Sequence, residues 1–65
     1  EAYRVRGTLS RVSGNKLVIE QEGSGQIVLE WQGKDKIDED WIDSYVGHLI
    51  DCLVVNGKGT RINRV

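Results

Sequence analysis

The sequence alternates apolar and polar residues over short segments that glycine-containing turns separate. A period of two is that of a β-strand with one buried face. Turns of this composition reverse the chain, because glycine and asparagine tolerate a positive φ. The first half of the chain is therefore predicted to form a meander of three strands, at residues 3–12, 16–21 and 26–31, with turns at residues 13–15 and 22–25.

The first of these strands is expected to bend. Its inward side chains are Tyr3, Val5 and Leu9, and Gly7 interrupts them. A glycine inside a strand often marks a bulge or the bend of a barrel strand, where a side chain would not fit. We therefore expect strong curvature near Gly7.

The acidic segment after the third strand has the spacing of a helix. Its apolar residues recur at separations of four, one, three and one, which places them on one helix face. Carboxylates suit the first turn of a helix, where Asp38 would cap free N–H groups, and Gly47 is a typical end. The prediction is one short helix over residues 38–46, with an apolar stripe made of Ile37, Trp41, Ile42, Tyr45 and Val46.

Two further strands complete the chain. Residues 48–55 are almost all apolar, which predicts a fourth strand buried more completely than the others. Asn56-Gly57 is typical of a two-residue hairpin turn, and Lys58-Gly59 extends it. Residues 60–65 form the predicted fifth strand, with Ile62 inward and with Arg61 and Asn63 outward.

The length of the chain leaves room for one core. A domain of 65 residues buries too little surface for a second domain. The one cysteine, Cys52, cannot close an internal disulfide, so packing must stabilise the fold. Residues 1–65 are therefore predicted to be a single all-β, or small α+β, barrel domain. Because the chain begins with Glu1 rather than methionine, we expect it to be excised from, or processed out of, a longer chain.

The order of the elements resembles the OB-fold over nearly the whole chain. The resemblance rests on Arg6-Gly7-Thr8 in the first strand, on the helix between the third and fourth strands, on Tyr45-Val46-Gly47 before the hairpin, and on Asn56-Gly57 within it. It implies a five-stranded barrel whose helix closes one end. The alternatives are an SH3-like or Tudor-like barrel and a meander sheet packed on one helix.

No group of residues predicts catalysis, a metal or a cofactor. His48 and Cys52 are four residues apart in a predicted strand, roughly 13 Å from each other and too far to share a metal ion. No base adjoins Cys52 in the sequence, and a single histidine leaves little from which to build a serine triad. The acidic cluster lacks the ligand spacing of an EF-hand. We therefore expect a protein that is not an enzyme and that holds no metal or cofactor.

Charge is distributed unevenly along the chain. Residues 1–16 carry a net charge of +3, residues 17–51 carry −7 and residues 52–65 carry +3. In a barrel where the first strand adjoins the fourth, and the fourth pairs with the fifth, the two basic ends meet. The predicted basic patch consists of Arg4, Arg6, Arg61 and Arg64. The alternative is an ordinary solvated surface with local ion pairs.

A second candidate surface lies on the predicted second and third strands. Its outward residues are Val18, Val28, Glu20 and Glu30, and the outward residues of the fourth strand add Leu49, Leu53 and Val55. Exposed apolar side chains of this kind mark interfaces. The carboxylates repel phosphate on the very strands with which OB-folds bind nucleic acid. The aromatic residues Trp31, Trp41 and Tyr45 are expected in the core rather than on a stacking surface.

These patterns favour a non-catalytic binding or accessory domain of a larger protein. Its expected partner is another protein, or the rest of its own parent chain, at the face that contains Val18, Val28, Glu20 and Glu30. The alternatives are binding of single-stranded nucleic acid on the arginine side and a purely structural domain. The sequence has neither a membrane span nor a signal peptide, and its cysteine is unpaired, so we expect a cytoplasmic rather than a secreted protein.

Overall fold

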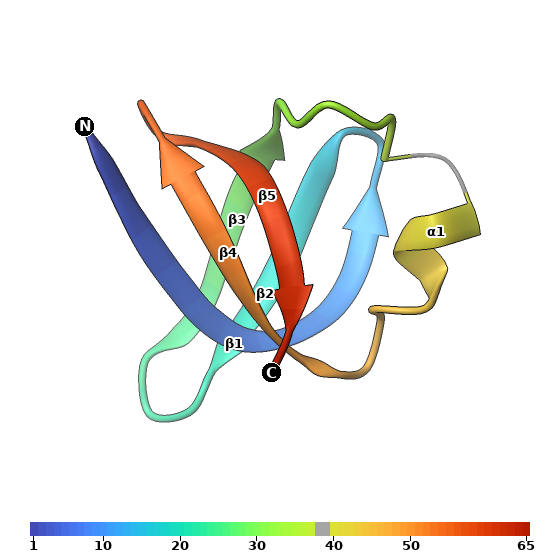
Figure 1. Ribbon diagram of the computed structural model, residues 1–65. Helices are drawn as coiled ribbons and strands as arrows, with labels where there is room; N and C mark the ends of the chain where they lie inside the picture. The colour runs from blue at the N-terminus through green and yellow to red at the C-terminus, as the bar shows by residue number, and fades with distance from the viewer. Residues whose placement is uncertain (38–39) are drawn as a thin grey trace.

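The computed structural model describes residues 1–37 and 40–65, which form five strands and one short helix (Figure 1). The strands are β1 (Ala2–Ser13), β2 (Lys16–Gln21), β3 (Gly25–Trp31), β4 (Leu49–Val55) and β5 (Lys58–Arg64), and the helix α1 (Asp40–Asp43) lies between β3 and β4. The predicted class, a β-rich domain with one short helix after the third strand, is confirmed. None of the described helical residues forms a helix long and apolar enough to cross a membrane.

The five strands form one sheet that closes on itself in the order β1-β2-β3-β5-β4. β1 makes this closure possible because it has two partners. Its first half, up to Thr8, pairs antiparallel with β4, and its second half, from Thr8 on, pairs antiparallel with β2. β4 pairs antiparallel with β5, so the predicted adjacency of the first, fourth and fifth strands is confirmed. The seam between β3 and β5 is short and parallel.

Gly7 lies where β1 changes partner. A Cβ atom at this position would lie 2.5 Å from the carbonyl oxygen of Glu20 and 2.7 Å from Cγ2 of Ile19, so β2 leaves no room for a side chain. A register shift between Leu9 and Arg11 adds a bulge a few residues later. A bulge increases the local bend and twist of a strand. The predicted curvature is therefore present, and its physical basis is the close approach of β2.

The closed sheet surrounds a core of aliphatic side chains. These come from alternate positions along the strands and from the segment that follows β3, namely Val5, Leu9, Leu17, Ile19, Leu29, Ile37, Ile42, Ile50, Cys52, Val54 and Ile62. The fourth strand, predicted to be buried more completely than the others, has three buried residues of seven and one exposed residue, and only β2 has a comparable buried share. The residues of β4 alternate between buried and more exposed, because no second layer covers the outer side of the sheet there.

The predicted helix over residues 38–46 is much shorter in the structure. α1 is a single turn, Asp40–Asp43, and turns continue from it to Gly47. The predicted cap at Asp38 lies outside the described residues. One turn cannot carry an apolar stripe, so Ile42 supplies most of the burial while Trp41 remains half-buried.

Tyr3 also differs from its prediction. The alternation of apolar and polar residues predicts that its side chain faces the core, but Tyr3 is 53% exposed. Tyr3 lies opposite Val54 of β4, whereas the pairing of β1 with β2 begins only at Thr8. The first residues of β1 therefore extend along β4 past the part of the sheet that encloses the core.

The steric constraint at Gly7 is testable. Gly7→Ala should lower the free energy of unfolding by about 1–3 kcal/mol, because the new methyl group must displace the β2 backbone. Urea denaturation measures this change. Gly14→Asn is the matched control, because Gly14 has a φ of 60° and open space around its Cβ position, and Asn tolerates that φ. Equal stability of Gly7→Ala and the wild type would contradict the close approach.

Ile42 should be the main contribution of the α1 segment to the core. Ile42→Ala is expected to cost about 2–5 kcal/mol through lost burial and the cavity that remains. The neighbouring exposed residue provides a control, and Asp43→Ala should change stability by no more than about 0.5 kcal/mol. Thermal and chemical unfolding of the two variants would show whether the short segment closes the barrel.

Candidate binding surfaces

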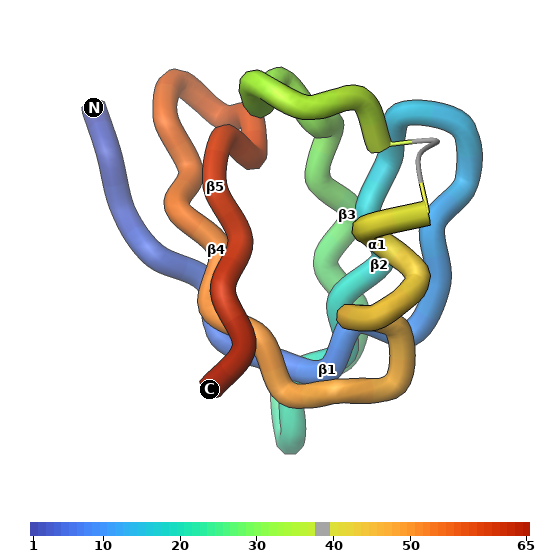
Figure 2. Tube along the Cα trace, turned by 45° about the vertical axis from the view of Figure 1, so that its right-hand side comes forward, coloured from blue at the N-terminus to red at the C-terminus, as the bar shows by residue number. Residues whose placement is uncertain are grey.

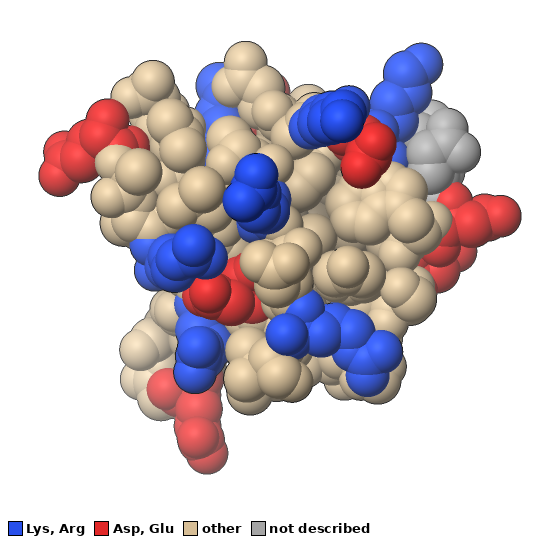
Figure 3. Space-filling model, in the orientation of Figure 1, with Lys and Arg blue, Asp and Glu red and all other residues tan. Residues whose placement is uncertain are grey.

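The outer face of β1, β4 and β5 brings the two basic ends of the chain together. Across the three strands, Arg4 lies opposite Leu53, and Leu53 lies opposite Arg61. In the next outward row of the sheet, Arg6 lies opposite Asp51. In Figure 3, Lys and Arg side chains gather over the middle of this face, and most Asp and Glu side chains lie at its margins. We call this surface the arginine face.

Asp51 neutralises part of the positive charge. Nη1 of Arg4 donates a hydrogen bond to Oδ2 of Asp51 at 3.0 Å. Arg6 and Arg61 form no ion pair with any residue that the structure describes. These two guanidinium groups can therefore bind an external carboxylate or phosphate without breaking an ion pair of the fold. The pair that Arg4 forms is exposed, and such pairs are worth only roughly 0–1 kcal/mol each.

The fourth residue of the predicted patch lies apart from the others. Arg64 is at the end of β5, opposite the buried Ile50. Its Nη2 atom lies 3.2 Å from Nδ1 of His48. The structure therefore brings Arg4, Arg6 and Arg61 together on one face and places Arg64 beside His48 at the end of the barrel.

Apolar side chains run along the middle of the arginine face. Leu49, Leu53 and Val55 lie on the outer side of β4, where Asp51 separates Leu49 from the other two, and Leu49 is 46% exposed. Leu53 and Val55 are half-buried. Arginine is enriched in the buried centre of protein interfaces, together with apolar side chains, whereas lysine and glutamate are depleted there. The arginine face shares the arginines and the apolar side chains of such a centre, although Asp51 lies within it.

One of the two apolar residues predicted on the outer face of β2 and β3 is buried in the structure. Val18 is 3% exposed, so the expectation that it faces solvent is wrong. β2 has a partner on each side, and Val18 lies between Arg11 of β1 and Val28 of β3. Neighbours on both sides leave little of its side chain accessible. Val28 is exposed as predicted, and so are the side chains of Glu20 and Glu30.

Glu30 also has a structural role. Its carboxylate accepts hydrogen bonds from Lys58 Nζ at 2.7 Å and from Asn15 Nδ2 at 3.4 Å. The hydrogen bond from Lys58 and the charge of its ammonium group lower the pKa of Glu30. Glu30 and Lys58 are in register at the parallel seam, so this pair joins β3 to β5 where the barrel closes.

The aromatic residues form a half-buried cluster and not the core that the sequence predicts. The ring centroids of Trp31 and Trp41 are 5.7 Å apart, and those of Trp41 and Tyr45 are 5.8 Å apart. Both indoles donate hydrogen bonds to main-chain oxygens, Trp31 to Asp35 at 2.7 Å and Trp41 to Lys36 at 2.6 Å. The two tryptophans therefore hold the loop that follows β3.

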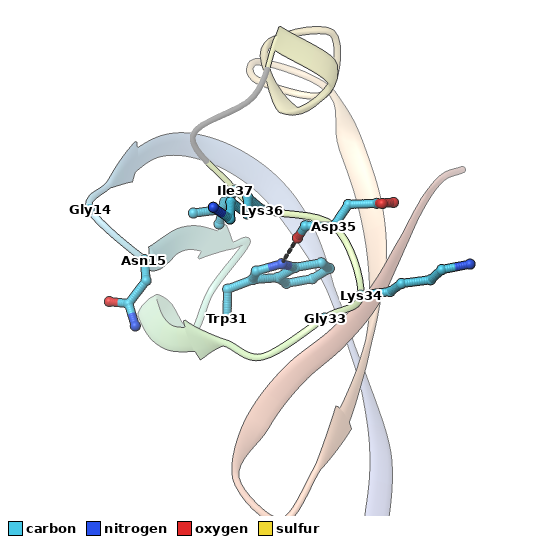
Figure 4. A pocket seen from close by; sticks show the side chains of 8 residues that line it. All are labelled: Gly14, Asn15, Trp31, Gly33, Lys34, Asp35, Lys36 and Ile37. Atoms are coloured by element: carbon cyan, nitrogen blue, oxygen red, sulfur yellow. Dashed lines mark hydrogen bonds between the residues drawn. The ribbon is translucent and has the colours of Figure 1, made fainter.

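Hollows lie on both sides of Trp31. One of about 280 Å³ lies between β5 and the α1 segment, and its lining includes all three aromatic rings together with Lys34 and Arg61. The other, of about 430 Å³, lies between the β1–β2 turn and residues 33–37 (Figure 4). In Figure 4 the side chains of Lys34 and Asp35 point away from the indole of Trp31, so this second hollow offers few convergent polar groups.

Gly33 is the sequence signal that could have revealed the aromatic cluster. A Cβ atom at Gly33 would overlap the ring of Trp31, so the chain passes directly over the indole. A tryptophan followed two residues later by a glycine is compatible with a ring that a loop covers. Period-two alternation alone counts Trp31 as inward and carries no information about this loop.

Cys52 is enclosed by the barrel. Its side chain is fully buried, and Sγ lies 3.7 Å from the carbonyl oxygen of Leu53. Burial, with a smaller contribution from the charge of Asp51, raises the pKa of Cys52 to about 11. A nucleophilic cysteine needs the opposite environment, one that is accessible and stabilises the thiolate. His48 is exposed and contacts Arg64.

No metal site is evident within residues 1–37 and 40–65, where no three His, Cys, Asp or Glu side chains are placed to hold an ion. Comparison with known proteins finds no family model, no curated protein and no solved structure that matches the chain.

The buried thiol predicts a pH dependence of stability. Because the pKa of Cys52 is raised from 9.0 to about 11, the neutral thiol favours the folded state below pH 9, and this contribution is lost as the pH rises from 9 to 11. The stability difference between the wild type and Cys52→Ala should shrink by about 2–3 kcal/mol over that interval. Urea denaturation at several pH values tests this, and a difference that stays constant would contradict it.

Proposed function

We propose that this domain is an OB-like barrel and a non-catalytic binding module, and that it binds an acidic segment of a partner protein on the arginine face. The observation that carries the proposal is the row in which Leu53 lies between Arg4 and Arg61, with Arg6 in the next outward row. Together the two rows combine an apolar centre with cationic groups, of which Arg6 and Arg61 are not paired within the described chain.

The strand order supports the OB-like part of the proposal. The barrel order β1-β2-β3-β5-β4 and the position of α1 between β3 and β4 agree with the resemblance found in the sequence. The bent β1, shared between β2 and β4, is the feature that closes the sheet. A barrel of this size has no interior space for a ligand, so binding takes place on its outer surface.

Charge complementarity would select the partner. A carboxylate that meets Arg6 or Arg61 loses little hydration at an exposed site, so each contact adds modest affinity but a strong preference over basic partners. The β2–β3 face carries Glu20, Glu30 and the exposed Val28, but its charges are mixed, because Lys58 pairs with Glu30 and Lys16 lies opposite it. The arginine face, with Arg6 and Arg61 beside an apolar row, therefore suits an acidic partner better.

Single-stranded nucleic acid is a second candidate ligand, and one observation favours it. The hollow beside β5 places Trp41 and Tyr45 next to Lys34 and Arg61. Aromatic side chains stack on bases, and adjacent cations bind the phosphates of the same strand. The main-chain hydrogen bonds of the two indoles and the cover that Gly33 provides for Trp31 indicate a structural role for these rings, which ranks this candidate second.

Anisotropy titrations with two labelled probes would separate the candidates. The probes are a glutamate-rich peptide and an oligothymidylate of similar charge, each at low and at physiological salt. We expect the peptide to bind at low salt, and Arg6→Glu or Arg61→Glu to weaken it at least tenfold. Lys16→Glu makes the same charge change on the β2–β3 side, where Lys16 lies opposite Glu30, and should change affinity less than twofold.

Two results would overturn this assignment. The first is no peptide binding at low salt, or equal weakening by Lys16→Glu, because neither outcome fits a site on the arginine face. The second is oligothymidylate binding that quenches tryptophan fluorescence and that Tyr45→Ala abolishes, which would establish the aromatic hollow as a nucleic-acid site. Tyr45→Ala leaves both tryptophans in place as reporters.

A further inference from the structure

The first half of β1 has a strand on only one of its sides. β4 pairs with it over Ala2–Thr8, whereas pairing with β2 begins at Thr8. Figures 1 and 2, which differ by a rotation of 45°, both show this half of β1 at the outside of the molecule with β4 along one edge. No strand within residues 1–37 and 40–65 pairs with the other edge of this half, which we call the open edge of β1.

The register identifies the main-chain groups on the open edge. The Asn56 amide donates to the Glu1 oxygen at 3.0 Å, and the Leu9 amide donates to the His48 oxygen at 3.1 Å. Both bonds join directly opposed residues, and in an antiparallel ladder such pairs alternate with pairs that form no bonds between them. The bonds to β4 therefore come from Tyr3, Val5 and Gly7, and the main-chain groups of Ala2, Arg4 and Arg6 point to the open edge.

Little of the described chain covers these groups. Nε2 of Gln21 donates to the carbonyl oxygen of Arg6 at 3.2 Å, where β2 ends. A hollow of about 640 Å³ lies at the same point, and its lining includes Arg6, Gly7 and Leu49 together with Glu20 and Glu22 at the end of β2. The open edge therefore presents a regular row of donors and acceptors. It consists of the amide and carbonyl groups of Ala2 and Arg4 and of the amide of Arg6.

The side chains beside this row define the chemistry of a strand that could add to it. Arg4 and Arg6 lie on the outer side of β1 and are exposed, whereas Tyr3 and Val5 lie on the inner side. Tyr3 leaves about half of its surface uncovered. Successive residues of an added strand would alternately meet the arginines and the aromatic ring, because side chains alternate between the faces of a sheet.

A second copy of the chain is a poor occupant of this edge. Two β1 strands paired antiparallel across it would place arginine opposite or next to arginine. Like charges in directly opposed positions destabilise a strand pair, and natural proteins protect edges from self-association with such charges. The same charges favour a strand that carries carboxylates on its outer side.

We propose that the open edge of β1 at residues 2–6 is a docking site for an extended segment of a partner protein that alternates acidic and apolar residues and joins the sheet as a sixth strand. The inference rests on the proposed function and specifies how the acidic partner binds. Strand addition gives affinity through main-chain hydrogen bonds and specificity through alternate side chains.

Two substitutions at one position separate strand addition from charge attraction. Arg4→Ala removes the charge and keeps the amide N–H on the open edge, whereas Arg4→Pro removes both. Proline is tolerated on a strand edge where its nitrogen does not bond to a neighbour. The probe is an eight-residue peptide of alternating Glu and Val, titrated into the ¹⁵N-labelled chain and followed by NMR. We expect shifts at the amides of Ala2, Arg4 and Arg6, and at least tenfold weaker binding for Arg4→Pro than for Arg4→Ala.

A second measurement keeps the test decisive if Arg4→Pro does not fold, as judged by circular dichroism. The same peptide N-methylated at every residue keeps its side chains and charges but has no main-chain donor, and it should fail to bind. Binding that Arg61→Glu weakens, but that neither Arg4→Pro nor N-methylation affects, would overturn strand addition and leave the proposed function intact. Absence of binding by every acidic peptide would reject both.

Sedimentation of the unliganded chain tests whether a second copy of the chain occupies the open edge. A dimer that Arg4→Pro converts to a monomer would assign the edge to a second copy and would overturn the acidic segment. A monomer in both forms is the expected result.

Discussion

The contact between β1 and β2 at Gly7 is the constraint on which the rest of the structure depends. Because no side chain intervenes, β1 can approach β2 closely, bend, and leave β4 for β2 within one strand. That change of partner converts a meander into a closed sheet and places the two basic ends of the chain on either side of β4. The arginine face and the open edge of β1 are both consequences of the same bend.

A small core explains why the aromatic residues lie outside it. Among the residues that the structure describes, eleven buried side chains fill the interior, and all of them except Cys52 are aliphatic. Rings as large as indole do not fit among them, so Trp31, Trp41 and Tyr45 pack near the seam between β3 and β5 and against the loop after β3. There the two indoles donate hydrogen bonds to main-chain oxygens, and the three rings shield the side of the core that the short seam leaves open. The seam itself depends on few contacts, among them the pair of Glu30 and Lys58.

Much of the fold was predictable because strand periodicity and turn chemistry are local properties. The order of the elements, the hairpin at Asn56-Gly57 with its two positive φ angles, and the inward position of Ile62 all follow from neighbouring residues. The errors share one physical cause. The alternation of apolar and polar residues predicts which face of the sheet a side chain lies on, but not which other residues cover that face. Val18 is buried because β2 has partners on both sides, and Tyr3 is exposed because β1 extends past the enclosed core. Of the predicted apolar stripe, only Ile37 and Ile42 are fully buried, whereas Trp41, Tyr45 and Val46 pack half-buried against the core.

The sequence by itself determined that the chain forms short strands with one buried face, that its core is small and free of disulfides, and that its positive charge lies at its two ends. These properties depend on residue type and on spacing of a few positions, which need no knowledge of distant contacts. Only the tertiary structure decided that Arg4, Leu53 and Arg61 form one row, that Trp31 lies under Gly33, and that the first half of β1 keeps a free edge. Each of these depends on which strands pair and in which register, and register is set by packing between residues far apart in the chain.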